Sequence, residues 1–171
     1  DEITMIYEVK GDGTRWLSQR KIGDTLDILG PLGNGFPAVD GPILVLGGGI
    51  GVPPMYLTAK RNHRADAVLG FRSGDKALLL EQFGAVCGET MVMTDDGSLG
   101  TKGFVAQGVA AMLEQKKYAA VMACGPKIML KTTYEAAQRA GVPCYVSMEE
   151  RMGCGIGACL VCAVKIRKNG E

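Results

Sequence analysis

Three cysteines lie close together near the end of the sequence, with glycines between them. Cys154, Cys159 and Cys162 have the spacing C-x4-C-x2-C. This is the first part of a spacing that wraps one loop of chain around a [2Fe–2S] cluster. The interleaved glycines permit the positive φ angles that converging thiolates require, and they let backbone N–H groups approach inorganic sulfide. We therefore predict that these three cysteines ligate iron.

Two other interpretations of the cysteines remain open, a structural zinc loop and three unrelated buried thiols. Zinc sites prefer C-x2-C pairs, so the spacing favours iron. No fourth cysteine follows Cys162. With three ligands, we expect the cluster to be absent or incomplete in this chain. The sequence also starts inside a strand-like run without an initiator Met, so we expect it to be truncated at both ends.

The composition is that of a soluble globular protein, with 47% hydrophobic and 22% charged residues in a chain of 171. Lys and Arg number 19 and Asp and Glu 18, which gives no electrostatic reason to expect nucleic acid or a membrane surface as a partner. No leader or membrane span is predicted. Six cysteines gathered toward one end favour metal chemistry in a reducing compartment, the cytoplasm.

Alternating strand and helix patterns fill residues 41–148. Short apolar runs predict five buried parallel strands at 43–46, 67–71, 90–94, 119–123 and 143–148. Helical patterns separate them at 53–62, 77–83, 103–117 and 126–140. This order predicts an α/β fold, a five-stranded doubly wound nucleotide-binding domain with right-handed crossovers. Ligands of such sheets bind beyond the carboxyl ends of the strands.

Residues 1–40 have a different pattern. Strands are predicted at 3–9 and 21–29, with a helical turn at 15–19 that begins at Thr14 as N-cap. A loop rich in glycine and proline at 30–37 marks a domain boundary. Because so few strands cannot bury a core, we predict that 1–40 is the remnant of a larger β-barrel or sheet. Residues 149–171 then form a third unit, a partial cluster module.

The glycine-rich loop Gly47-Gly48-Gly49-Ile50-Gly51 follows the first strand of the α/β domain. Such a loop before a helix N-terminus is suited to bind phosphate. It is not a strict G-x-G-x-x-G motif, because Val52 occupies the third glycine position. The alternative is a tight turn that binds nothing. No acidic residue ends the second strand, and Arg72 there would fit the 2′-phosphate of NADPH.

Three further positions have weaker signals. Cys124 ends the fourth predicted strand, where it is either a site residue or a small packing residue. The polar loop at 94–103 either contacts a nucleotide or is merely solvated. The acidic pair Glu149-Glu150 has a solvated turn as its ordinary interpretation, and His63 lies in a charged helix end without a nucleophile nearby.

Several motifs together carry a family resemblance that covers essentially the whole chain. They are Gly30-Pro31-Leu32-Gly33-Asn34-Gly35-Phe36, the glycine loop at 47–51, Thr94-Asp95-Asp96-Gly97-Ser98, Cys124-Gly125-Pro126 and Glu149-Glu150-Arg151-Met152 before Cys154. The chain resembles the ferredoxin–NADP reductase superfamily. Within it, the chain looks most like the iron–sulfur electron-transfer subunits of class B dihydroorotate dehydrogenases.

The resemblance implies a route for electrons from NADH through FAD and a [2Fe–2S] cluster. They would end at a partner, the FMN-containing catalytic subunit that oxidises dihydroorotate in pyrimidine biosynthesis. The matching positions imply FAD contacts at Ile6, Tyr7, Glu8, Gly13 and Thr14. They imply NADH contacts at Gly49, Gly51, Cys124 and Gly125, and iron ligands at Cys154, Cys159 and Cys162. The family's main flavin motif would precede Asp1.

Two alternative functions stay open from the sequence. One is another subunit of the same superfamily, such as a ferredoxin:NAD(P) oxidoreductase or the flavin subunit of a sulfhydrogenase. The other is a nucleotide-binding module with a zinc loop and no redox role.

Overall fold

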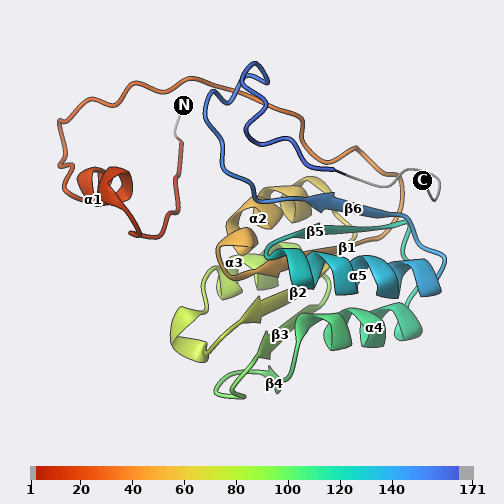
Figure 1. Ribbon diagram of the computed structural model, residues 1–171. Helices are drawn as coiled ribbons and strands as arrows, with labels where there is room; N and C mark the ends of the chain where they lie inside the picture. The colour runs from red at the N-terminus through yellow and green to blue at the C-terminus, as the bar shows by residue number, and fades with distance from the viewer. Residues whose placement is uncertain (1–2, 166–171) are drawn as a thin grey trace.

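A single parallel sheet of six strands organises the computed structural model, which describes residues 3–165 (Figure 1). The strand order is β4-β3-β2-β1-β5-β6. The doubly wound α/β fold is as predicted, but the count of five strands is wrong. The strands are β1 (Ile43–Gly48), β2 (Ala65–Phe71), β3 (Thr90–Thr94), β4 (Thr101–Lys102), β5 (Ala120–Cys124) and β6 (Cys144–Ser147). The two residues of β4 are exposed and have no apolar pattern that would reveal a strand.

Helices cover both faces of the sheet (Figure 1). Residues of α2 (Val52–Arg61) and α3 (Leu80–Val86) pack into one hydrophobic cluster, and residues of α4 (Val105–Gln115) and α5 (Lys127–Arg139) into another. Short 3₁₀ turns, η1 (Gly49–Gly51) and η2 (Gly74–Lys76), follow β1 and β2. None of the helices in residues 3–165 has both the length and the apolar surface needed to cross a membrane.

The central strands show why their sequences are apolar without a break. Ile43 and Val45 of β1 pack toward α2 and α3, whereas Leu44 and Leu46 pack toward α4 and α5. All four side chains are buried. A strand covered on both faces has no solvated side, so it needs no polar alternation.

The N-terminal segment differs from the prediction. Residues 3–42 contain one helix, α1 (Asp12–Ser18), and otherwise turns and irregular chain without strands. The strands predicted at 3–9 and 21–29 are therefore not formed, and a barrel remnant is not confirmed. No residue from 3 to 40 is buried. The physical reason is that a strand needs a neighbouring strand for its backbone hydrogen bonds and an apolar layer for its side chains.

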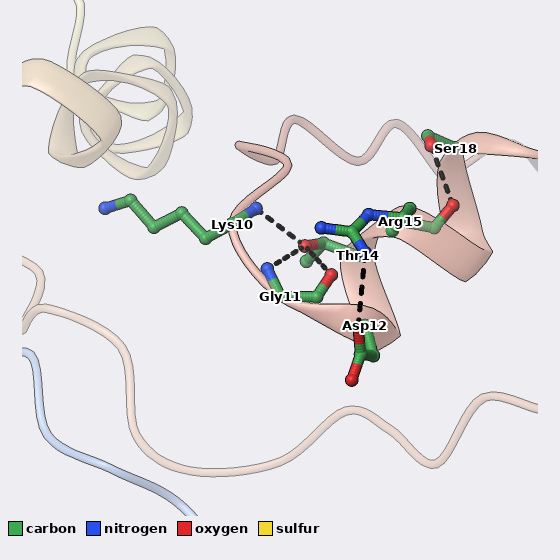
Figure 2. Close-up of polar contacts among 6 residues, drawn as sticks. All are labelled: Lys10, Gly11, Asp12, Thr14, Arg15 and Ser18. Carbon is green, nitrogen blue, oxygen red and sulfur yellow. Dashed lines mark hydrogen bonds and ion pairs between the residues drawn. The ribbon is translucent and has the colours of Figure 1, made fainter.

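Helix α1 starts three residues before the predicted turn, with Gly11 rather than Thr14 as its N-cap. Figure 2 shows how Thr14 acts instead: its Oγ1 accepts hydrogen bonds from the backbone N–H groups of Lys10 at 2.9 Å and Gly11 at 3.2 Å. Thr14 is thus the third residue of the helix, N3, and its side chain accepts hydrogen bonds from the N–H groups before the helix. This is the role of the N3 side chain in a capping box.

A polar network closes the amino-terminal edge of the sheet. The carboxylate of Asp66, at the start of β2, accepts hydrogen bonds from Glu89 N–H at 2.7 Å and from the Tyr118 hydroxyl at 2.8 Å. The ammonium of Lys116 lies 2.9 Å from both the Asp66 and Glu89 carboxylates. These contacts tie β2, the entry to β3 and the chain between α4 and β5 together, at the edge opposite the strand ends where ligands bind.

Candidate nucleotide cavity and cysteine loop

A cavity of about 530 Å³ lies beyond the carboxyl ends of β1 and β2. Its walls come from the glycine-rich loop, the ends of β2 and β3, and the first turns of α4 and α5. The lining residues are Gly48, Gly49, Gly70, Phe71, Arg72, Asp95, Phe104, Val105, Ala106, Gln107, Pro126, Ile128, Met129 and Thr132. This is where doubly wound sheets bind their ligands.

The glycine-rich loop forms one wall of the cavity. Its first two glycines leave no room for a side chain, because an added Cβ would collide with neighbouring residues. A Cβ on Gly47 would lie 2.7 Å from the Cα of Val52, and one on Gly48 would overlap the sulfur of Met129. Gly49 differs, since its φ is +54° and nothing lies within 4 Å of a Cβ built on it. The space in front of Gly49 is therefore open to a ligand, next to the start of α2.

Gly51, Cys124 and Gly125 lie behind the cavity wall and are not among its lining residues. A Cβ on Gly51 would collide with the Cys124 carbonyl, and one on Gly125 would lie 3.3 Å from Gly48. The loops after β1 and β5 are thus stacked backbone on backbone. Cys124 is 6% exposed, and burial raises the pKa of its thiol. The structure brings Gly49 to the cavity, whereas Gly51, Cys124 and Gly125 support its wall.

The polar loop after β3 contributes a single side chain to the cavity, that of Asp95. Its neighbour Asp96 instead accepts a hydrogen bond from the Ser98 hydroxyl at 2.6 Å. Arg72, at the end of β2, lines the same cavity. One cationic and one anionic group therefore face the space beyond the second and third strands.

Sequence reasoning missed the first turns of α4 and α5. Phe104, which is 70% exposed, and Met129 line the cavity. Gln107 does too, and its side chain accepts a hydrogen bond from the Phe104 N–H at 2.9 Å. Their place in the sequence could have identified these residues. Each lies in the first turn of a helix that follows a strand, where this fold places its binding residues.

The cysteine loop follows β6 and contains neither helix nor strand up to residue 165. The Sγ of Cys154 accepts a hydrogen bond from the backbone N–H of Cys159 at 3.4 Å. The pKa of the Cys154 thiol is lowered to about 6. The largest cause is this hydrogen bond from Cys159, and the next is one from the Ile156 backbone. Gly155 and Gly157 have φ angles of +71° and +79°. The loop folds around the thiolate of Cys154 by turning its N–H groups inward.

The donor chemistry of the loop fits an iron–sulfur cluster, because thiolates and inward N–H groups are what such a cluster requires. Cys159 and Cys162 are exposed. Within residues 3–165, no three His, Cys, Asp or Glu side chains are grouped so that they could hold a metal ion. Ligation by Cys154, Cys159 and Cys162 therefore stays a prediction. Residues 166–171 of the predicted module lie outside the described part of the chain, as do residues 1–2.

The residues expected to contact FAD lie in the N-terminal segment. Ile6 is 42% and Tyr7 39% exposed, so both are accessible to a flavin. Glu8 pairs with Lys10 at 3.0 Å, and the hydroxyl of Thr14 is bound to backbone. Neither these residues nor Gly13 lines the nucleotide cavity. Flavin binding at this segment also stays a prediction.

Family models and curated relatives agree on one family. Residues 149–171 match the model of the iron–sulfur cluster binding domain of dihydroorotate dehydrogenase B. The electron transfer subunit of dihydroorotate dehydrogenase B (NAD(+)) from Caldanaerobacter subterraneus subsp. tengcongensis is 43% identical, over 99% of this chain and 68% of the relative. The same subunit from Geobacillus kaustophilus is 45% identical, over 96% of this chain and 65% of the relative.

Solved structures agree with the fold. The NADH-dependent reduced ferredoxin-NADP oxidoreductase superposes with a TM-score of 0.79 at 35% identity, over 91% of this chain and 58% of that one. The C-terminal domain of the PF1911 hydrogenase from Pyrococcus furiosus has a TM-score of 0.57 at 22% identity, over 70% of this chain and all of that one, and supports the fold alone. The chain, which spans about two thirds of its curated relatives, belongs to the family of dihydroorotate dehydrogenase B electron transfer subunits.

Proposed function

We propose that this chain carries electrons from NADH to an FMN-containing dihydroorotate dehydrogenase subunit in the cytoplasm. The observation that carries the proposal is the position of the two candidate sites. The nucleotide cavity lies beyond the carboxyl ends of parallel strands, and the cysteine loop leaves the carboxyl end of β6 in the same sheet. Both the cavity and the start of the cysteine loop therefore lie at the carboxyl ends of the strands. The family relationship supports the same reading.

In this proposal the cavity binds NADH. The open space at Gly49 receives the pyrophosphate, because backbone N–H groups and the start of α2 favour negative charge there. Arg72 and Asp95 flank the space that the adenosine end would occupy. The Asp95 carboxylate repels a 2′-phosphate and so offsets the attraction of Arg72. Together with the NAD(+)-linked relatives, this favours NADH over NADPH.

The N-terminal segment and the cysteine loop hold the other two groups. When bound, FAD would supply hydride acceptance from NADH, and a [2Fe–2S] cluster would supply one-electron transfer. Tyr7 and Ile6 present exposed apolar surface for the flavin. Cys154 offers a thiolate already stabilised by loop N–H groups, with Cys159 and Cys162 as further ligands. We assign residues 1–40 to flavin binding, 41–148 to NADH binding and 149–171 to the cluster.

Gly49→Val tests the nucleotide site. The added side chain enters the open space in front of the loop, so we expect the Kd for NADH to rise at least about tenfold, a loss of roughly 1.4 kcal/mol. Isothermal titration of the full chain measures it. Gly141→Val is the control, since Gly141 also has a positive φ, +68°, nothing lies within 4 Å of its added Cβ, and it does not line the cavity. Circular dichroism confirms that both variants fold.

An unchanged affinity in folded Gly49→Val would place NADH elsewhere. The redox proposal has its own test in the anaerobically purified full chain. Flavin and [2Fe–2S] absorbance that bleach on addition of NADH, and co-purification with an FMN-containing orotate-forming subunit, are the expected results. Tightly bound zinc in place of iron would contradict it.

A further inference from the structure

The chain between β6 and the cysteine loop is anchored to α5 by an ion pair. Residues 148–153 form no helix or strand. Within them, the carboxylate of Glu150 contacts the ammonium of Lys127. The Glu150 side chain is only 27% exposed, whereas that of Lys127 is 62% exposed. Glu150 is therefore not part of a freely solvated acidic turn, because it is drawn down onto the start of the helix.

The position of Lys127 is electrostatically unfavourable for the helix itself. It is the first residue of α5, where the helix dipole favours negative charge, and the first turn of α5 contains no acidic residue. Glu150 supplies the missing negative charge from a distant part of the sequence. Helix stability alone gives no reason for a lysine here, whereas a contact with the cysteine-loop segment does.

Lys127 also stands next to the cavity wall. Its neighbours in sequence, Pro126 and Ile128, line the nucleotide cavity, and Gly125 packs against Gly48 of the glycine loop. On the other side of the ion pair, Glu150 precedes Cys154 by four residues. The ion pair thus joins the chain beside the cavity wall to the segment that leads into the cysteine loop.

We propose that Lys127 and Glu150 are positioning residues that fix the cysteine loop relative to the nucleotide cavity. A displacement of Glu150 moves Cys154 with it, because only three residues separate them. The rate of electron transfer falls steeply as donor and acceptor move apart, so the pair sets the rate at which electrons enter the cluster. This kinetic consequence rests on the proposed function, whereas the anchoring of the loop does not.

Hydrogen–deuterium exchange of the full chain tests the anchoring without any cofactor. In Lys127→Gln and in Glu150→Gln, we expect amides of residues 152–162 to exchange about two- to fivefold faster, the range for loss of a partly exposed ion pair. The charge-reversed double variant, Lys127→Glu with Glu150→Lys, restores the wild-type exchange rates. Lys131→Gln is the matched control, since it breaks the exposed Lys131–Glu135 pair on the same helix.

Stopped-flow reduction of the loaded protein by NADH tests the kinetic consequence. We expect flavin reduction to keep its rate in both single variants, while cluster reduction slows by a similar two- to fivefold, with recovery in the charge-reversed variant. A variant that merely loosened the whole fold would slow both steps. Equal exchange rates in wild type and variants, or failure of the reversed pair to restore them, would overturn the proposal. Wild type that loads no flavin or cluster would refute the proposed function alone, and the exchange result would still decide the anchoring.

Discussion

At the scale of single residues, the six thiols fall into chemically different groups. Burial raises the pKa of Cys87 and of Cys144 to about 11, and it also raises that of Cys124. Hydrogen bonds from the loop lower the pKa of Cys154 to about 6. Thiolates are the form that binds metals and reacts with electrophiles. The protein thus keeps the thiols of the α/β domain neutral and favours the thiolate form of one thiol in the cysteine loop.

Cys144 gives a prediction for the pH dependence of stability. Its pKa is raised in the folded state, so its contribution to stability is complete below pH 9.0 and is lost as pH rises toward about 11. We therefore expect the free energy of unfolding to fall between pH 9 and pH 11, and to fall less steeply in Cys144→Ala. Urea denaturation at a series of pH values measures the slope. Parallel curves for wild type and variant would show that Cys144 does not titrate with unfolding.

From the sequence, a residue could be expected at the cavity only where it has a local signature. Gly49 at the cavity was recognisable because a glycine cluster between a strand and a helix has few other uses. Phe104 and Met129 were not recognisable as cavity residues. Their shared position depends on two helices that start far apart in the sequence and meet at the carboxyl ends of the strands. The ion pair of Lys127 with Glu150 could not be predicted for the same reason, because the fold brings two distant parts of the sequence together.

At the scale of elements, the network around Asp66 locks strands and helices at the amino-terminal edge. Burial, reinforced by the Asp66 carboxylate, raises the pKa of Tyr118, so its hydroxyl stays a donor further into the alkaline range. Hydrogen bonds to two carboxylates raise the pKa of Lys116, and Glu89 has a larger effect than Asp66. One buried carboxylate thus organises three partners from two connections, the one before β3 and the one between α4 and β5.

Asp66→Ala removes the common acceptor of this network. The variant leaves the hydroxyl of Tyr118 and the N–H of Glu89 without their partner, so we expect a loss of about 2–3 kcal/mol in the free energy of unfolding. Chemical denaturation by urea measures it. The exposed neighbour Lys117→Ala is the control, with an expected change within about 0.5 kcal/mol. A loss below that limit in Asp66→Ala would mean that water replaces the carboxylate without cost.

The elements themselves were predictable where burial dictates the pattern. The apolar runs at 43–46, 67–71 and 90–94 all coincide with strands of the sheet. Strand β4 escaped because two exposed residues carry no pattern, and the strands expected at 3–9 and 21–29 failed because pattern alone supplies no pairing partner. A strand is a property of its neighbours as much as of its sequence.

At the scale of the whole molecule, stability is distributed unevenly between the N-terminal segment and the sheet. No residue between 3 and 40 is buried, whereas β1, β2 and β5 are buried throughout. Segments with little buried apolar surface open with little free energy and are cut first by proteases.

Limited proteolysis with trypsin should show this difference. We expect cleavage after Arg15, Arg20 and Lys21 at least about tenfold faster than after Lys60 and Arg61 of α2, because opening α2 requires loss of core packing. The comparison is internally controlled, since the residues at all five sites are exposed. Mass spectrometry of timed samples gives both rates. Similar rates at the two groups of sites would mean that the N-terminal segment is as well protected as the helix.

The position of the cysteine loop after β6 has a consequence for how such proteins diversify. In the described sheet β6 pairs with β5 on one side and has no strand on its other side. A module that leaves an edge strand can be exchanged for another without breaking a central hydrogen-bonded ladder. The α/β domain can therefore serve as a common platform, onto which different C-terminal modules are grafted behind the same edge strand.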